Sequence, residues 1–327
     1  MSTTEQDTLA QNSQRQISLT DAFPSKGKQF HPEMRDEFEV NAPTPPELMR
    51  RRARSHYGFI IGGGFVLAVV FIAIFAPFII PYDPFDQELT KRLIDPIWGK
   101  TGTWTHVLGT DALGRDYLTR VIYGARISLM IGFFAAAVSA VVGSALGIIG
   151  GYFGGRLDAV IMYLINVKLA LPPILVALSL VSVFGGSILA LILILGFLFW
   201  DRYAVVTRSV TQQIRANDYV TAAEAVGASK LRILAGEILP NVMNQIIVII
   251  SLEMAVAILV EAALSFLGLG VKPPTPSWGL LVSEGRSYMF FKPFLITIPG
   301  LAIFFLVIAI NMLGDGIRDI TAPEGRN

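Results

Sequence analysis

The feature that most constrains this chain is a series of long, almost uncharged apolar segments. A helix of about 20 apolar residues crosses the hydrocarbon core of a bilayer, where backbone polar groups must be satisfied within the protein. Six segments of the 327-residue sequence reach that length, so we predict an all-α polytopic membrane protein with six transmembrane helices. The predicted spans are residues 57–80, 127–149, 159–184, 188–206, 242–267 and 294–313. Pro172 and Pro173 predict a kink within the third span.

Composition supports the membrane class and narrows the chemistry. Hydrophobic residues make up 53% of the chain and charged residues only 16%, which excludes an ordinary soluble domain. A formal net charge of +1 gives no basic field for nucleic acid. There is no cysteine, and His31, His56 and His106 are scattered singly, so we predict no metal, cofactor or catalytic residues.

The charges before the first span predict the orientation. Arg50, Arg51, Arg52 and Arg54 precede that span, and no basic residue follows until Lys91, so its N-terminus is predicted to be cytoplasmic. An even number of spans then puts both termini on the cytoplasmic side. The predicted organisation is a disordered or loosely ordered tail at 1–55, a transmembrane domain at 56–323 and a C-terminal tail at 324–327.

A polar, alanine-rich stretch, NDYVTAAEAVGASKLRILAGEILPN at 217–241, separates the fourth and fifth spans. Asp218 can cap a first short helix, and Gly227 can end it in a left-handed conformation. Ser229 can cap a second short helix, and Pro240 can open the next span. The residues expected to line one face of the two helices are Tyr219, Ala223 and Val226, then Leu231, Leu234 and Ile238. The plain alternative is a cytoplasmic loop that binds no partner.

This stretch resembles the coupling-loop signature of bacterial ABC importer permeases. The resemblance rests on Ala222, Ala223, Gly227 and Leu239-Pro240, with thirteen positions from the glycine to the proline. The sequence departs from the family pattern at Thr221 and Glu237, which puts the contribution of those two side chains in doubt. The resemblance implies that the loop contacts an ATPase through Tyr219, Ala222, Ala223, Glu224, Gly227, Ala228, Leu231, Leu239 and Pro240.

Two further blocks resemble the peptide-importer branch of these permeases. One is LGTDALGRD at 108–116, in a predicted external segment at 82–126, where we expect Asp111, Arg115 and Asp116 to be structural. The other is ALSFLGLGVKPPTPSWG at 263–279, which opens a predicted external loop at 268–292 and whose glycines and prolines exclude regular helix. Candidate residues for an external gate or for contact with a binding protein are Gly268, Gly270, Pro274, Pro276 and Trp278.

Ionisable residues inside spans are costly and therefore candidates for function. The candidates are Lys168, Asp201, Arg202, Glu253 and Glu261. They could form a polar lining for a translocation path or make buried contacts between helices, and we expect Glu261 to position the loop at 263–279. A seam of small residues in the second span could pack against a partner permease or within the subunit. Its members are Ala136, Ala140, Gly143, Ser144 and Gly147.

The resemblance as a whole implies a permease subunit with the type I ABC importer fold in a bacterial inner membrane. It would pair with a second permease, two cytoplasmic ATPases and an external substrate-binding protein, and would move di- or oligopeptides inward by alternating access. ATP and magnesium would bind the partner ATPases, since the P-loop-like Gly99, Lys100 and Thr101 lack the earlier glycine of that motif. Nickel, opine or oligosaccharide import, a secondary transporter and a membrane-embedded enzyme are the alternatives.

Overall fold

The computed structural model describes residues 45–321. The tails predicted at 1–55 and 324–327 lie outside these residues, apart from helix α3 (Pro45–Ser55), which begins ten residues before the tail's predicted end. From residue 51 onward the described chain forms one compact unit.

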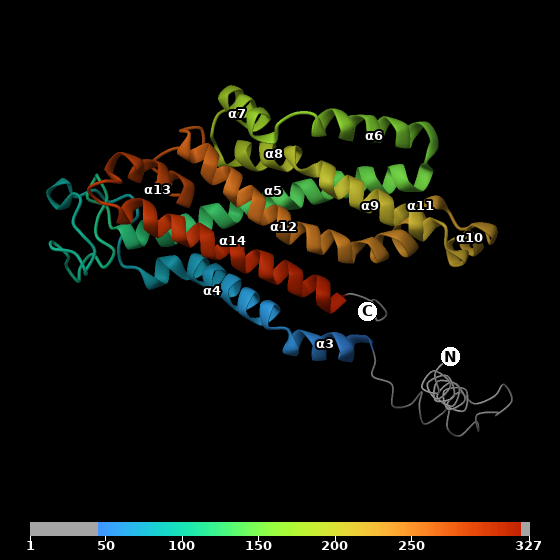
Figure 1. The fold of residues 1–327 in the computed structure, drawn as a ribbon, viewed down its shortest axis with the longest axis horizontal. Helices are drawn as coiled ribbons and strands as arrows, with labels where there is room; N and C mark the ends of the chain where they lie inside the picture. The colour runs from blue at the N-terminus through green and yellow to red at the C-terminus, as the bar shows by residue number, and fades with distance from the viewer. Residues whose placement is uncertain (1–44, 322–327) are drawn as a thin grey trace, which may run out of the picture. The chain divides into compact units, whose positions relative to one another are not determined.

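The unit is built from helices joined by short connections, except for a long segment between the first two (Figure 1). They are α4 (Tyr57–Ile79), α5 (Tyr117–Phe153), α6 (Gly155–Leu169), α7 (Pro173–Phe184), α8 (Ile188–Leu198), α9 (Trp200–Arg215), α10 (Asp218–Ala225), α11 (Lys230–Ile233), α12 (Leu239–Phe266), α13 (Trp278–Gly285) and α14 (Phe294–Thr321). A one-turn π-helix, η2 (Leu234–Ile238), joins α11 to α12, and single 3-10 turns occur at Leu89–Lys91 and Arg286–Tyr288.

The predicted transmembrane character is confirmed. Within residues 45–321, five helical segments are long and apolar enough to cross a bilayer, and a sixth crossing results if the bent pair α6 and α7 forms one span. That pair bends by 87°. The bend follows from Pro172 and Pro173, because a proline disfavours helix in the residue before it and cannot donate a backbone hydrogen bond.

Several helices run beyond the spans predicted from apolar length. α5 begins at Tyr117, so ten residues of the predicted external segment are helical, and Asp116 caps the helix by accepting a hydrogen bond from the Thr119 backbone N–H at 2.8 Å. α8 and α9 together form a segment that ends at Arg215, and α14 continues to Thr321. Polar residues extend these ends because their side chains find partners at the bundle ends.

α5 lies among the other long helices and packs most extensively on α9, α12 and α8. Its small residues make this approach possible. A Cβ added at Gly143 would lie 2.1 Å from the Trp200 carbonyl oxygen, and one at Gly147 would lie 2.1 Å from the Thr207 hydroxyl. At these two positions the predicted small-residue seam therefore packs against α9 of the same chain.

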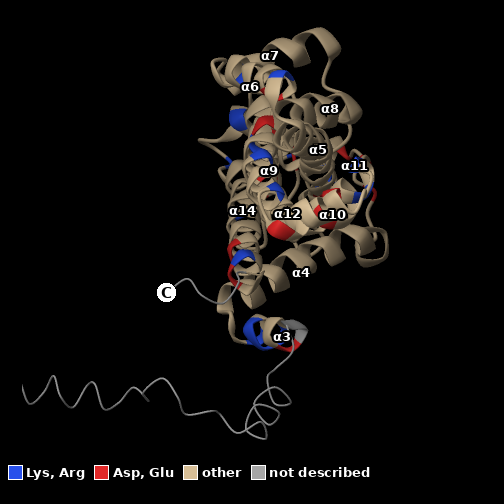
Figure 2. Cartoon of the chain, turned by 90° about the vertical axis from the view of Figure 1, so that its right-hand side faces the viewer, with Lys and Arg blue, Asp and Glu red and all other residues tan. Residues whose placement is uncertain are grey.

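The unit has two distinct ends (Figure 1). α10 and α11 lie at one, here called the α10 end, and α13 with the long segment before α5 lies at the other, the α13 end. His56 beside the start of α4 hydrogen bonds Asp319 near the end of α14 at 3.0 Å, which joins the first and last long helices. Each of the five candidate spans contains a stretch with at most two charged side chains, as expected for helices that face lipid. Figure 2 looks onto the α10 end, where acidic and basic residues are seen on α9, α10 and α14.

Candidate functional site

The turn after α10 has the geometry predicted for Gly227. Gly227 adopts φ +86°, its N–H donates to the Glu224 carbonyl at 3.0 Å, and the Ala228 N–H donates to the Ala223 carbonyl at 3.0 Å. These two bonds define a Schellman motif, in which a left-handed residue ends a helix. The start of the helix was predicted one residue too late, because Asn217 occupies the cap position and Asp218 lies in the first turn, where its charge favours the helix dipole.

The second short helix also begins as predicted but does not end where expected. The Ser229 hydroxyl accepts a hydrogen bond from the Arg232 backbone N–H at 3.4 Å and so caps α11. α11 then continues through η2 into α12 without a break, giving one helical segment over Lys230–Phe266. Pro240 falls in the first turn of α12, where the lack of an N–H is tolerated. The second half of the loop is therefore the N-terminal end of a long helix.

Three apolar side chains anchor this loop to the bundle. Val220 and Ile233 are each 1% exposed and Ile238 is 0% exposed, and they share a core with Tyr152 of α5 and Val242 of α12. The residues predicted to share a face are not all covered. Tyr219 and Leu231 are 44% and 76% exposed, whereas Ile238 is buried.

Polar contacts add to the anchor at the end of α5. The Tyr152 hydroxyl donates to the Glu224 carboxylate at 3.1 Å, and Arg215 of α9 donates to the Tyr152 carbonyl at 2.5 Å. The Lys230 ammonium lies over the Phe153 ring, 5.5 Å from its centroid. Glu224 thus faces α5, which sequence reasoning did not predict.

Several apolar side chains are exposed among the polar ones on the outer surface of the loop. Val226 is 90% exposed and Leu239 is 40% exposed. Val226 also lines a hollow of about 320 Å³ together with Gly227, Ala228 and Glu237. Clustered exposed apolar side chains with a polar rim are typical of a protein interaction surface. Of the nine predicted contact residues, Tyr219, Ala222, Glu224, Gly227, Leu231, Leu239 and Pro240 are exposed and Ala223 and Ala228 are half-buried.

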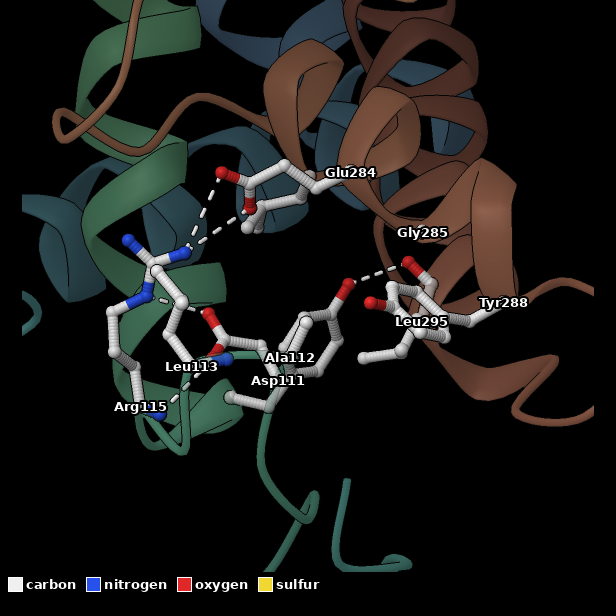
Figure 3. A pocket seen from close by; sticks show the side chains of 10 residues that line it. Asp111, Ala112, Leu113, Arg115, Glu284, Gly285, Tyr288 and Leu295 are labelled. Carbon is white, nitrogen blue, oxygen red and sulfur yellow. Dashed lines mark hydrogen bonds and ion pairs between the residues drawn. The ribbon is translucent and has the colours of Figure 1, made fainter. Parts of the chain in front are cut away.

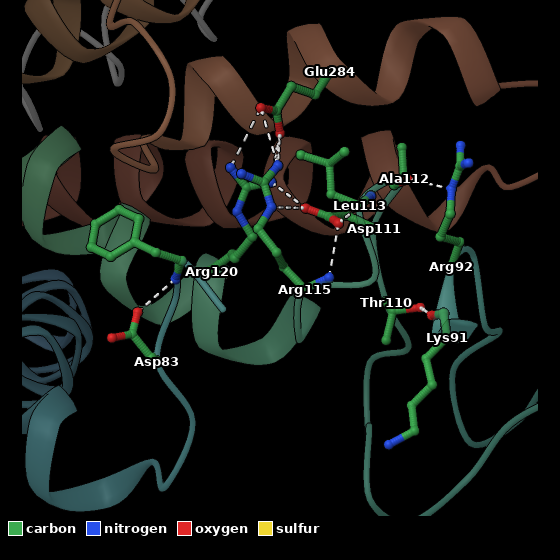
Figure 4. A network of polar contacts seen from close by, with 11 residues as sticks. Asp83, Lys91, Arg92, Thr110, Asp111, Ala112, Leu113, Arg115, Arg120 and Glu284 are labelled. Atoms are coloured by element: carbon green, nitrogen blue, oxygen red, sulfur yellow. Dashed lines mark hydrogen bonds and ion pairs between the residues drawn. The ribbon is translucent and has the colours of Figure 1, made fainter. Parts of the chain in front are cut away.

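A buried ionic network lies at the α13 end (Figure 4). The Asp111 carboxylate accepts hydrogen bonds from Arg115 Nε at 2.6 Å and from Arg120 Nη1 at 2.7 Å. Arg120 Nη1 also donates to Glu284 of α13 at 2.5 Å. The network therefore fastens the segment before α5 to α13, in keeping with the structural role predicted for Asp111 and Arg115.

The same network forms one wall of a cavity of about 210 Å³ (Figure 3). On its other side the Tyr117 hydroxyl donates to the Leu295 carbonyl at 2.6 Å. Sequence reasoning missed Glu284 altogether and gave Arg120 no role. Arg120 belonged to the matching block, but nothing in the sequence linked it to a carboxylate 164 positions away.

Asp116, the third charged residue of that block, pairs with His106 rather than joining the network. Its carboxylate lies 3.0 Å from His106 Nδ1, and both side chains are buried. The same carboxylate accepts the capping hydrogen bond at the start of α5. Asp116 therefore ties the segment before α5 to the first turn of that helix.

The loop predicted at 268–292 contains α13, so part of it is helical. Trp278, a candidate for the external gate, is 4% exposed, and its indole N–H donates to the Val121 carbonyl of α5 at 2.7 Å. Glu261 of α12 accepts hydrogen bonds from Ser265 at 2.8 Å and Ser277 at 3.0 Å, so it holds this loop as predicted. Of the five candidate residues, Gly268 and Pro274 are exposed and Gly270, Pro276 and Trp278 are buried.

The remaining ionisable residues of the spans meet in pairs. Lys168 of α6 hydrogen bonds Asp201 of α9, and Arg202 of α9 donates to Glu253 of α12 at 2.9 Å. Lys168 is the penultimate residue of α6, and Asp201 and Arg202 lie in the second half of the span predicted at 188–206. Within residues 45–321 no three His, Asp or Glu side chains gather in a way that could hold a metal ion.

Comparison with known proteins decides the family. Residues 143–326 match the family model described as the binding-protein-dependent transport system inner membrane component. The chain belongs to this family. Residues 44–96 also match the N-terminal transmembrane domain of oligopeptide transport permease C. The family assignment makes the chain a multi-pass inner-membrane transport subunit and agrees with the resemblance drawn from the coupling loop.

Individual relatives match this chain over most of their own length. The chain is 41% identical to the dipeptide transport system permease protein of Haemophilus influenzae, covering 83% of this chain and 92% of that protein. It is 39% identical to the di/tripeptide transport system permease protein of Pseudomonas aeruginosa, covering 87% and 94%. Among solved structures, the inward-facing MetNI methionine ABC transporter matches with a TM-score of 0.52 at 16% identity, over 62% of this chain and 97% of that chain. That likeness shows a shared fold.

Proposed function

We propose that this subunit passes di- or oligopeptides into the cytoplasm as part of an ATP-driven importer. A second permease would complete the pathway, an external binding protein would deliver the peptide, and two cytoplasmic ATPases would bind ATP and magnesium. The peptide substrate is inferred from relatives that are 39–41% identical over more than 80% of this chain and are named as dipeptide or di/tripeptide permeases.

The observation that carries the proposal is the contrast between the two faces of the α10 loop. Val220 and Ile233 are buried against the bundle, whereas Val226 and Leu231 are 90% and 76% exposed. A surface that is rigidly attached and openly apolar is suited to receive a moving partner and to pass its displacement on to α5, α9 and α12. We assign the ATPase contact to this surface, which places the α10 end and both chain termini in the cytoplasm.

The test is peptide uptake into proteoliposomes that contain the purified complex. Uptake of a labelled dipeptide should require ATP, the binding protein and the ATPase subunits together. Uptake driven by an ion gradient without ATP would favour the secondary-transporter alternative and overturn the proposal. ATP-dependent uptake of nickel, an opine or an oligosaccharide in place of the peptide would retain the mechanism and replace the substrate.

A further inference from the structure

Arg202 is a charged side chain exposed within a predicted span. It lies in the second half of the span predicted at 188–206, and its side chain is 59% exposed. Charged side chains inside spans face a water-filled cavity or another protein more often than lipid, although a long stem can carry the charge toward the interface. Arg202 therefore faces either an aqueous path or another protein.

The charges around Arg202 are arranged asymmetrically. Its carboxylate partner Glu253 is 1% exposed and the neighbouring Asp201 is 2% exposed, so both acids lie behind the guanidinium. Asp201 is neutralised by Lys168, whose side chain is 18% exposed. Since the two acids are covered, the group presented outward is a positive charge.

The space in front of Arg202 is an open hollow of about 350 Å³. Its walls are mainly aliphatic, with Val205 and Leu252 on either side and Asp201, Arg202 and Glu253 as the charged part. A cationic head beside an aliphatic wall suits an anion that carries an apolar group. Arginine also binds carboxylates through two parallel hydrogen bonds, which gives direction as well as strength.

A second observation indicates that this cluster is incomplete as it stands. Glu253 accepts from Arg202 through Oε1 at 2.9 Å, but its other oxygen, Oε2, is buried with no hydrogen-bond partner. Buried carboxylate oxygens are normally satisfied, and one left open is costly. This oxygen is not exposed to the hollow, so a hydrogen-bond donor would reach it only after the surrounding side chains move.

We infer that Arg202, Glu253 and the hollow between α9 and α12 form a substrate subsite that binds the C-terminal carboxylate of a peptide in transit. Arg202 binds the carboxylate, Glu253 holds Arg202 in place, and Val205 and Leu252 contact the last side chain. The inference rests on the proposed peptide importer and adds to it a specific contact with the permease. The competing explanation is that Arg202 pairs with a carboxylate of the sister permease.

The test compares two peptides of one sequence, one with a free C-terminal carboxylate and one amidated. Uptake is measured in proteoliposomes with binding protein saturated by each peptide. Because the binding protein is the same in every sample, the ratio of the two uptake rates changes between permease variants only through the permease. Co-purification of the sister permease and the ATPases reports assembly for each variant.

Arg202→Met should reduce uptake of the free-carboxylate peptide by at least about tenfold, the loss expected when a charged hydrogen-bond partner is removed. Uptake of the amide should change far less. Uptake of the free-carboxylate peptide by Arg202→Lys should lie between that of the wild type and that of Arg202→Met, because an ammonium keeps the charge but not the paired hydrogen bonds. Arg208→Met is the matched control, since Arg208 lies on the same helix and pairs with Asp158 at 2.5 and 2.6 Å. Arg208→Met should change the uptake of both peptides by the same factor.

The charge swap Arg202→Glu with Glu253→Arg separates recognition from packing. It restores an ion pair, so the complex should assemble, but it presents a carboxylate to the hollow and should still fail to move the free-carboxylate peptide. Recovery of that uptake by the swap, or an equal loss of both peptides in Arg202→Met, would overturn the subsite. If the wild-type complex moves neither peptide, the proposed function itself is wrong, and the subsite falls with it.

Discussion

Substituting valine for Gly227 tests whether the shape of the α10 turn matters for coupling. Gly227 adopts φ +86°, and a Cβ added there would meet no heavy atom within 4 Å. The substitution therefore introduces no steric clash with the rest of the chain. Its cost within this subunit is confined to the backbone, because a β-branched residue is strongly disfavoured at positive φ.

The magnitude follows from that backbone strain. A left-handed conformation costs an L-residue about 1–2 kcal/mol, and one to two kcal/mol corresponds to a factor of roughly 5–30 in a two-state equilibrium. We expect Gly227→Val to depopulate the Schellman turn by such a factor while leaving insertion and pairing with a sister permease intact. Gly227→Asn should be much milder, since asparagine adopts this region more readily.

The assay is ATP hydrolysis stimulated by loaded binding protein, together with peptide uptake, in the purified complex. Gly236→Val is the matched control, because a Cβ added at Gly236 would also meet no heavy atom within 4 Å, but the φ angle of Gly236 is not positive. Both activities should fall several-fold in Gly227→Val and stay near wild type in Gly236→Val and Gly227→Asn. Normal stimulation and uptake in Gly227→Val would refute the claim that this turn transmits the ATPase movement.

The anchoring of the loop, an ion pair at the α13 end and the topology can each be tested separately. Val220→Ala should lower the free energy of unfolding by about 2 kcal/mol. Val226→Ala should leave the free energy of unfolding unchanged and reduce stimulated ATP hydrolysis. Equal effects of the two variants on unfolding would contradict the division into anchored and exposed faces. The hydrogen bond from Lys292 holds the pKa of Asp95 below its ordinary value. The loss of stability caused by Asp95→Asn should therefore be constant above about pH 5 and disappear only as the pH falls below about 4. If thermal unfolding showed wild type and Asp95→Asn to be equally stable near neutral pH, the ion pair would be contradicted. Trp104 is 84% exposed at the α13 end, so Trp104→Cys should react with an impermeant thiol reagent added outside intact cells and Val226→Cys should not; the reverse pattern would invert the topology.

The sequence predicted those parts of the fold that depend on local chemistry. Apolar length alone located the spans, and Pro172 located the break between α6 and α7. Gly227 and Ser229 were assigned their turn and cap from residue type, because a left-handed turn and a side-chain cap are decided within a few residues. These features need no knowledge of what packs against them.

The parts that could not be predicted depend on distant partners. Val220 is buried because the end of α5 approaches that face of α10, and no pattern within the loop records this approach. α5 begins before its apolar window because Asp111 and Glu284 neutralise Arg120. Candidate charges in the spans were recognised singly, but their pairing across α9 and α12 required the structure.

The most direct test of the central claim is a cross-link between the α10 loop and an ATPase subunit. The chain contains no cysteine, so Val226→Cys introduces a unique thiol on the exposed face of the loop. A thiol-specific photo-cross-linker attached there should join the permease to a cytoplasmic ATPase in the intact complex. The same reagent at Pro274→Cys, exposed at the α13 end, should not. Cross-linking to the ATPase from Pro274→Cys and none from Val226→Cys would contradict the account.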